Sequence, residues 1–284
     1  MMNRREEVRK LLRLSPEEVR GRAGKHLIVC ENLDELHKLF ARHIADEILK
    51  HNKLGKPIKL ILPVGPIGQY PYFINIVKKE EISLEKCWIF FMDEYCDEDG
   101  SAVATSHPLS FRKIAAEHFI EPLRIFSDIN TNQIHFPKED NLDELSAIIE
   151  DLAGIDTCFG GIGIHGHIAF NEPEENVNTL GYRKVKLNNY TRTINAVRAQ
   201  VGGNLECFPL NAYTIGMKQI LNSNKIRLYC RNGTPYDWAN TILRIALFAR
   251  PGNDYPVTYI RSRKNRDYII ITDKDTLQAP KNII

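Results

Sequence analysis

Two imidazoles and a carboxylate lie close together between residues 160 and 173, in a stretch rich in glycine. His165 and His167 are two residues apart, and Glu172 follows five residues after His167. Histidine exchanges protons near neutral pH, and a carboxylate can orient an imidazole or share its proton transfers. Glycine lets the backbone approach a ligand closely. These residue types at this spacing predict acid–base chemistry on a small molecule.

A metal site is a second interpretation of the same residues. His165 and His167 would share a face in an extended chain, and a His-x-His pair followed by Glu172 resembles the metal-binding run of a cupin. Cupins are all-β proteins, whereas this chain has strong helical patterns. We therefore expect no bound metal, and acid–base chemistry is the leading interpretation.

Asp93 and Glu94 come directly after the apolar run 87–92. Partial burial beside such a run would raise the pKa of Asp93 and make it a better proton acceptor. The alternative is an ordinary loop carboxylate that caps a turn. We predict Asp93 as a catalytic base and Glu94 as a substrate-binding residue.

Residues suited to an anion occur after two other apolar runs. Gly65 and Gly68 follow the run 58–62, and Arg231 and Thr234 follow the run 226–230. Thr234 is expected to cap a helix whose free N–H groups, with Arg231, could bind phosphate. An ordinary capped helix fits equally well. Another pair on a predicted helix, Arg192 and Arg198, are anion candidates or part of a solvated face.

Short apolar runs alternate with segments of helical periodicity along the chain. Apolar residues at consecutive positions indicate strands covered on both faces, as in parallel sheets. We predict a single-domain α/β fold with a doubly wound, mostly parallel sheet and helices on both faces, a Rossmann-like arrangement. Predicted strands are 26–30, 58–62, 87–92, 155–159, 212–215, 226–230, 257–260 and 268–272; predicted helices are 33–48, 109–119 (after Ser106 as a cap), 142–152 and 238–249.

The carboxyl ends of parallel strands meet at one edge of a sheet, where ligands bind. Four of the polar groups singled out above follow predicted strands, so we expect them to gather at that edge: residues 65–68, 93–94, 165–172 and 231–234. Residues 1–24 are rich in Arg and Glu, and Ser15-Pro16-Glu17-Glu18 starts a short helix. We predict a peripheral helical extension over 1–24 and an α/β domain over 25–284.

Charge and composition exclude several classes of function. A net charge of +2, from 38 basic and 36 acidic residues, gives no reason to expect nucleic acid or an anionic membrane as a partner. No stretch approaches the roughly 18 consecutive apolar residues of a membrane span, and the first residues lack the apolar segment of a signal peptide. The six cysteines form no C-x-x-C pair. Together these features predict a reducing, cytoplasmic setting.

Two ordered motifs resemble the glucosamine-6-phosphate deaminase (isomerase) family, which is related to the 6-phosphogluconolactonases. The first is Phe91-Met92-Asp93-Glu94-Tyr95 with Ser106-His107-Pro108-Leu109-Ser110-Phe111; the second is Gly160-Gly161-Ile162-Gly163 with Gly166-His167-Ile168-Ala169-Phe170-Asn171-Glu172-Pro173. The resemblance implies that His167, held by acidic neighbours such as Glu172, helps to open a sugar ring. It implies that Asp93 then moves a proton between C2 and C1, giving fructose 6-phosphate and ammonia without a cofactor.

The chain departs from the family at three places. His165 stands where the family has an aspartate, so an anion that would orient His167 is missing. The loop from Gly65 to Gly68 contains a proline without an N–H and lacks the family's hydroxyl residue. Thr234 lies near the position of the family's phosphate-binding lysine, although Arg231 is close in the sequence.

We therefore expect an amino-sugar phosphate deaminase/isomerase, and these departures are consistent with an altered substrate held by Arg198 or Arg231. A catalytically impaired sugar-binding protein and a 6-phosphogluconolactonase-like hydrolase are the alternatives. The expected partner is a small-molecule sugar phosphate, with no cofactor, no nucleic acid and no membrane, and a homo-oligomer is left open. Predicted catalytic residues are Asp93, His165, His167 and Glu172; predicted substrate-binding residues are Gly65, Gly68, Glu94, Arg198, Arg231 and Thr234.

Overall fold

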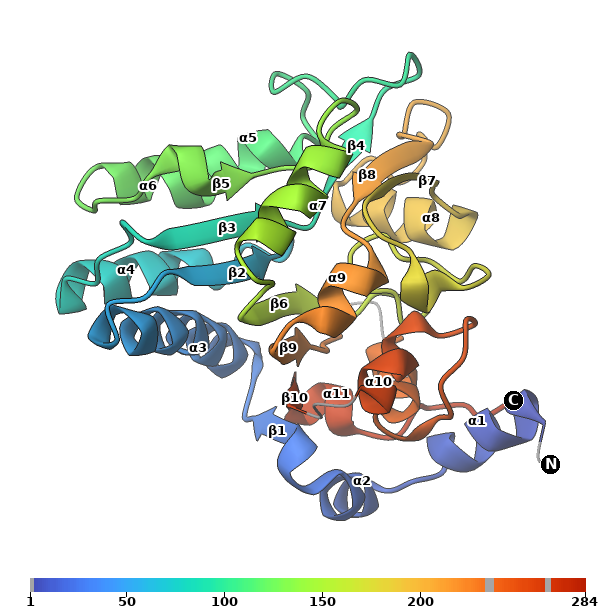
Figure 1. Ribbon diagram of the computed structural model, residues 1–284. Helices are drawn as coiled ribbons and strands as arrows, with labels where there is room; N and C mark the ends of the chain where they lie inside the picture. Colours follow the sequence, from blue (N-terminus) through green and yellow to red (C-terminus); the bar gives the residue numbers. More distant parts are fainter. Residues whose placement is uncertain (1–2, 233–237, 264–266) are drawn as a thin grey trace.

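A parallel sheet forms the centre of the computed structural model, which describes residues 3–232, 238–263 and 267–284 (Figure 1). Seven strands of the described chain pair in the order β1-β10-β9-β6-β2-β3-β5, all parallel. This confirms the predicted doubly wound α/β fold. The strands are β1 Leu27–Cys30, β2 Ile58–Leu62, β3 Cys87–Phe91, β5 Ile134–His135, β6 Thr157–Gly161, β9 Lys225–Tyr229 and β10 Tyr268–Asp273.

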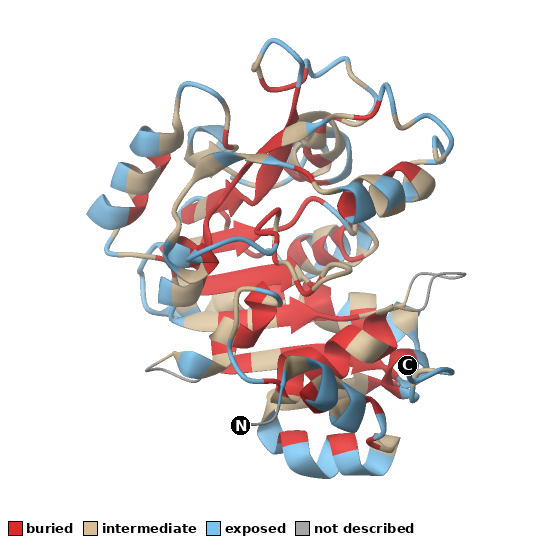
Figure 2. Cartoon of the chain, turned by 90° about the vertical axis from the view of Figure 1, so that its right-hand side faces the viewer, coloured by how far each residue is buried: buried red, intermediate tan, exposed pale blue. Residues whose placement is uncertain are grey.

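Successive residues of each strand pack against two different helical layers. In β2, Leu60 contacts the cluster that includes α3 and α4, whereas Ile61 contacts the cluster that includes α9 and α10. Figure 2 shows buried residues concentrated in the strands and on the inner helix faces. Burial on both sides is why the strands are apolar at consecutive positions. The main helices are α3 Leu33–Lys53, α4 Tyr70–Glu80, α7 Leu142–Asp151, α9 Met217–Asn222 and α10 Ala239–Phe248.

Helix α3 illustrates how the sequence forms these layers. Asn32 accepts a hydrogen bond from the Glu35 N–H and caps the helix. Leu36, Phe40 and Ile44, spaced at helical intervals, are fully buried against the sheet. The predicted helix at 33–48 is therefore confirmed.

A second, smaller sheet lies beside the carboxyl ends of the central strands (Figure 1). It consists of β4 Asp93–Cys96, β8 Asn211–Thr214 and β7 Arg183–Lys186, paired antiparallel in the order β4-β8-β7. The prediction that 212–215 joins the parallel sheet is wrong, because strand β8 pairs with β4 and β7 instead. An apolar run indicates a buried strand but does not specify its neighbours.

Two other predictions need correction. Residues 257–260 belong to a 3-10 helix, Pro256–Ser262, which begins at a proline and buries Val257 and Ile260 as a strand would. The helix expected after Ser106 begins later, because Ser110 is the residue whose side chain caps α5. Remaining elements are α5 Phe111–Ala115, a π-helical turn Ala116–Ile120, α6 Glu121–Arg124, α8 Asn189–Arg198, α11 Lys274–Leu277 and 3-10 turns at Gly24–His26, Thr131–Gln133 and Val177–Thr179.

The N-terminal helices α1 Arg4–Leu12 and α2 Pro16–Ala23 lie beside α10. Ser15 and Glu18 form a reciprocal capping box at the start of α2, as the sequence indicates. Val19 is fully buried in the same core cluster as α10. The division of the chain at residue 24 stays a prediction. Within the described residues, none of the helices has both the length and the apolar character that a bilayer span requires.

Arg244 joins α10 to the N-terminal segment and to the C-terminus. Its side chain is fully buried, and its guanidinium donates to the carbonyls of Leu14, Asn240, Leu277 and Gln278. Lysine cannot satisfy all of these acceptors at once. We expect Arg244→Lys to lower the free energy of unfolding in urea by about 3 kcal/mol.

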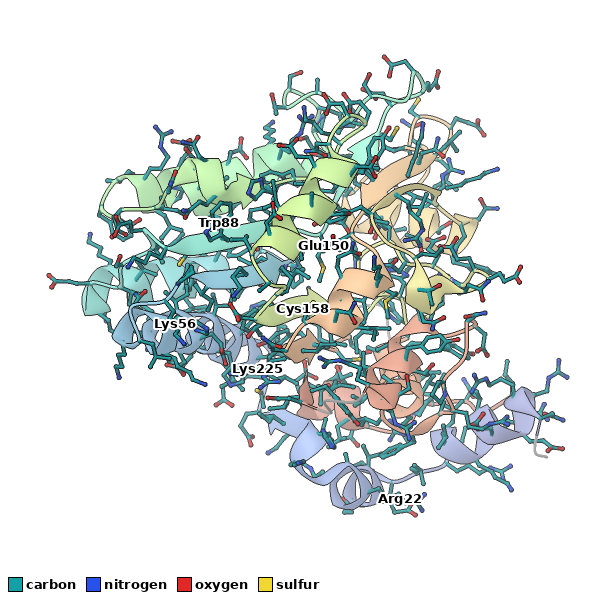
Figure 3. All side chains as sticks on the ribbon, viewed as in Figure 1. Arg22, Lys56, Trp88, Glu150, Cys158 and Lys225 are labelled. Carbon is teal, nitrogen blue, oxygen red and sulfur yellow. The ribbon has the colours of Figure 1, made fainter. Side chains whose placement is uncertain are left out.

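Arg22 provides the matched control for that substitution. It lies on the outer side of α2 and forms an exposed pair with Glu18 at 3.0 Å (Figure 3). Arg22→Lys should change the free energy of unfolding by less than about 0.5 kcal/mol. Equal urea midpoints for the two variants would contradict the role assigned to Arg244.

Candidate active site

Asp93 lies where the chain passes from the central sheet into the small one. It is the first residue of β4, just beyond the end of β3, and is only 8 % exposed. It therefore belongs to a strand and not to the turn-capping loop that was the alternative interpretation. Burial, with a further contribution from the negative charge of Glu94, raises the pKa of Asp93 to about 8.

Glu94, the neighbour of Asp93, is held by the start of α5. Its fully buried carboxylate accepts hydrogen bonds from the Ser110 hydroxyl and from the N–H groups of Phe111 and Arg112, at 2.9–3.0 Å. The Arg112 guanidinium pairs with it at 3.3 Å. The start of α5 therefore occupies this carboxylate, and binding of substrate by Glu94 stays a prediction.

His167 packs directly over the glycine-rich backbone that follows β6. A Cβ on Gly163 would lie 1.8 Å from the Nε2 of His167, so this ring position requires glycine at residue 163. Burial lowers the pKa of His167 to about 3, and positive charge on His165 and Arg198 contributes in the same direction. The ring is therefore neutral at physiological pH.

The N-terminus of α8 contacts His165 and Glu172, the two side chains grouped with His167. Asn188 caps this helix; its amide nitrogen is 2.9 Å from His165 Nε2, and Thr191 Oγ1 is 3.2 Å from the same atom. The Asn188 N–H donates to Glu172 Oε2 at 2.7 Å. His165, His167 and Glu172 each place one potential ligand atom within 4.8 Å of the other two.

Thr214 connects this loop to Asp93. It is the β8 residue paired with Asp93, and its hydroxyl accepts a hydrogen bond from the N–H of Phe170, which lies between His167 and Glu172. Buried Asn171 fixes the same turn by donating to the carbonyls of Ile168 and Ile215. No sequence pattern marks Thr214 as a positioning residue, because its pairing with β4 is a tertiary contact.

Two arginines lie close enough for their charges to interact, and one of them, Arg198, also acts on His167. Arg198, at the end of α8, reaches solvent and stacks on Trp238 at 4.4 Å. The protein packed around its guanidinium lowers the pKa of Arg198 to about 10, and the positive charge of Arg231 contributes. None of the ion pairs in the described part of the chain involves either arginine. Two guanidiniums that repel each other in this way favour the binding of an anion.

His37 is a site residue that the sequence analysis missed. The ring lies against the loop from Gly65 to Gly68, because a Cβ on Gly68 would be 2.2 Å from His37 Cε1. Burial lowers the pKa of His37, the positive charge of Arg231 lowers it further, and Asp34 opposes both effects. Within the described chain, its buried Nε2 has no hydrogen-bond partner. No sequence pattern places a residue of α3 beside this loop.

Three further residues, Gly65, Thr234 and Arg192, were candidates for binding an anion. Gly65 is exposed at the start of the loop, and Thr234 lies outside the described residues. Arg192 donates to the carbonyls of Leu205 and Phe208, so it holds the segment after α8 rather than an anion.

The fold and this edge of the sheet define a class of protein. A buried carboxyl of raised pKa, an imidazole pair and clustered basic groups lie beyond the carboxyl ends of parallel strands, where α/β enzymes bind small molecules. This is the class of α/β enzymes that move protons on small anionic substrates.

Comparisons with known proteins define the family within that class. No family model matches the chain. A glucosamine-6-phosphate deaminase of Caenorhabditis elegans is 31% identical over 71% of this chain and 74% of its own, and one of Borrelia garinii is 30% identical over 87% and 89%. The chain belongs to the glucosamine-6-phosphate deaminase family.

Solved structures show the same fold at lower identity. A monomeric glucosamine-6-phosphate deaminase superposes with a TM-score of 0.75 at 23% identity, covering 88% of this chain and 98% of its own. A 6-phosphogluconolactonase of Shewanella baltica gives 0.61 at 17% identity, covering 87% and 97%. The resemblance expected from the two sequence motifs is therefore confirmed.

The contact between Gly163 and His167 gives a prediction that needs no substrate. Gly163→Ala should displace the His167 ring and lower the free energy of unfolding by about 1–3 kcal/mol, because the added methyl overlaps Nε2. Gly161→Ala is the matched control, since a Cβ there would meet no described atom within 4 Å. Thermal unfolding and a crystal structure of each variant would measure both effects; an unmoved ring in Gly163→Ala would contradict the predicted contact.

Proposed function

We propose that this protein is a glucosamine-6-phosphate deaminase, which converts an amino-sugar phosphate and water to a ketose phosphate and ammonia. The observation that carries the proposal is the buried Asp93 carboxyl, with its pKa raised to about 8, joined through Thr214 to the loop of His167 and Glu172. Family membership supports the same reaction.

Asp93 is the base of the proposed reaction. Its carboxylate removes the proton from C2 of the open-chain sugar and returns it to C1. This transfer moves the carbonyl function to C2 as an imine, which water hydrolyses to release ammonia. A carboxyl whose pKa lies near the working pH can both accept and return a proton, and positioned acid–base groups contribute about 10²–10⁴-fold each.

The phosphate is bound, in this proposal, by the basic groups on the other side of the site. Arg198 and Arg231 repel each other, and the positive charge of Arg231 lowers the pKa of His37. A phosphate among them would relieve that repulsion and accept charge-assisted hydrogen bonds. His37 beside Gly68 would supply a donor in a loop that has Pro66 and Ile67 instead of a hydroxyl residue.

A binding protein without turnover is the second candidate. His167 is neutral and only weakly basic, which makes it a poor catalyst of ring opening. Such a protein would be stabilised by glucosamine 6-phosphate but would release no ammonia. The similar 6-phosphogluconolactonase structures support the fold alone.

We infer a cytoplasmic setting and a small-molecule partner. The cysteines, all within the described part of the chain, are free thiols, and five of them are buried. Free thiols are typical of reducing compartments. A sugar phosphate as substrate fits the basic residues of the site.

Asp93→Asn tests the proposed reaction. We expect release of ammonia and fructose 6-phosphate from glucosamine 6-phosphate to fall by about 10²–10⁴-fold, because the base is removed. Asp140→Asn, at an exposed carboxylate, should leave turnover unchanged. Ligand-induced stabilisation of the wild type without any product would contradict the deaminase and favour the binding protein.

The raised pKa of Asp93 also predicts a pH dependence. The carboxylate is the reactive form, so kcat/KM of the wild type should rise about tenfold per pH unit up to about pH 8 and then level off. Because the folded pKa lies above the ordinary value, stability contributed by the protonated form is lost as pH rises towards 8. The stability of Asp93→Asn relative to wild type should therefore increase with pH over that range and then stay constant. A difference independent of pH in urea unfolding would contradict the shift.

His37→Ala tests the phosphate site. KM for glucosamine 6-phosphate should rise about tenfold with little change in kcat, because one hydrogen bond to a charged group is lost. Weak turnover or binding of unphosphorylated glucosamine should not change. His118→Ala, at an exposed histidine outside the site, is the control. An equal loss for both sugars would show that His37 does not contact the phosphate.

A further inference from the structure

The arrangement around His165 leaves two buried polar atoms without partners. Within the described chain, Nδ1 of His167 and Oε1 of Glu172 have no hydrogen-bond partner. Each unsatisfied buried group costs about 1–3 kcal/mol. One potential ligand atom from each of His165, His167 and Glu172 lies within 4.8 Å of the other two, so the three side chains are grouped closely enough to close around a single cation.

We propose that His165, His167 and Glu172 bind one divalent transition-metal ion at the edge of the sugar site. Two imidazoles and one carboxylate suit Zn²⁺, Fe²⁺ or Mn²⁺, and three protein ligands leave coordination positions open for a substrate oxygen. The helical pattern of the chain does not fit a cupin, and for that reason no bound metal is expected from the sequence alone. The geometry of these three side chains is independent of that argument.

Hydrogen bonds from the start of α8 fix two of the three proposed ligands. His165 Nε2 accepts a hydrogen bond from the Asn188 amide and lies 3.2 Å from Thr191 Oγ1, so the neutral ring carries its proton on Nδ1. Binding of a metal through Nδ1 requires that proton to move to Nε2, where the Thr191 hydroxyl can accept it. Glu172 uses Oε2 towards the Asn188 N–H and leaves Oε1 over. A carboxylate that binds a metal is typically held in this way through its other oxygen.

Charge also favours the ion. Glu172 supplies the negative charge, and Arg198 is the cation whose repulsion the site must overcome. The carboxylate is 7 % exposed, so water competes little for it.

The role of the ion rests on the proposed function. A cation at this position would polarise an oxygen of the sugar and assist ring opening as a Lewis acid. Ring opening would then not depend on the basicity of His167. A chain with His165 in place of the family's aspartate could then still open the sugar ring, with Glu172 as a metal ligand and Asp93 as the base of the later proton transfer.

The test measures metal binding separately from turnover. Full-length protein is stripped with a chelator, dialysed and titrated with Zn²⁺ and with Mn²⁺ by calorimetry. We expect the wild type to bind one equivalent and to gain thermal stability. His165→Ala and Glu172→Gln should each weaken binding by at least about tenfold; Glu172→Gln keeps an oxygen for the Asn188 N–H and guards against misfolding. His118→Ala should bind as the wild type does.

Two results would overturn the metal site. One is a folded, stripped wild type that binds neither ion; the other is unchanged affinity in both ligand variants. Failure of the deaminase proposal has a different signature, because metal would bind but no ammonia would form. Chelation that abolishes turnover, with recovery on adding Zn²⁺ or Mn²⁺, would support both proposals together.

Discussion

The burial of the Asp93 carboxyl at the junction of the two sheets is the constraint on which the site depends. Asp93 lies just beyond the end of β3, as the first residue of β4, and its carboxyl is buried there away from water. This burial raises the pKa of Asp93 to about 8. The small sheet exists at this edge because β4 pairs with β8, and that pairing brings Thr214 between Asp93 and the imidazole loop. Reactivity and architecture therefore have the same origin.

Two adjacent carboxylates illustrate how environment separates roles. Glu94 is more deeply buried than Asp93, but it accepts hydrogen bonds from the start of α5 and pairs with Arg112. Its negative charge is compensated there and still raises the pKa of its neighbour. Helix α5 thus holds the strand in place and leaves Asp93 as the carboxyl available for proton transfer.

Much of the fold could be predicted because its strands are buried on both faces. The runs 58–62 and 226–230 predicted strands close to those observed, since short runs of consecutive apolar residues between helices are typical of buried parallel strands. The predicted secondary structure or sheet was wrong where a buried apolar run is compatible with more than one arrangement. Residues 257–260 are as apolar as a strand but form a 3-10 helix, and 212–215 is a strand of a different sheet.

The order of residues along the chain was enough to predict the central parallel strands and the family motifs. It also showed the chemical types of the site residues Asp93, His165, His167 and Glu172. The contacts between these groups and distant segments could not be predicted from that order. Folding in three dimensions places α5 against Glu94, His37 of α3 against Gly68, and α8 against both His165 and Glu172. Periodicity and residue type act locally along the chain, whereas contacts between distant segments depend on sheet order and helix packing, which no local pattern encodes.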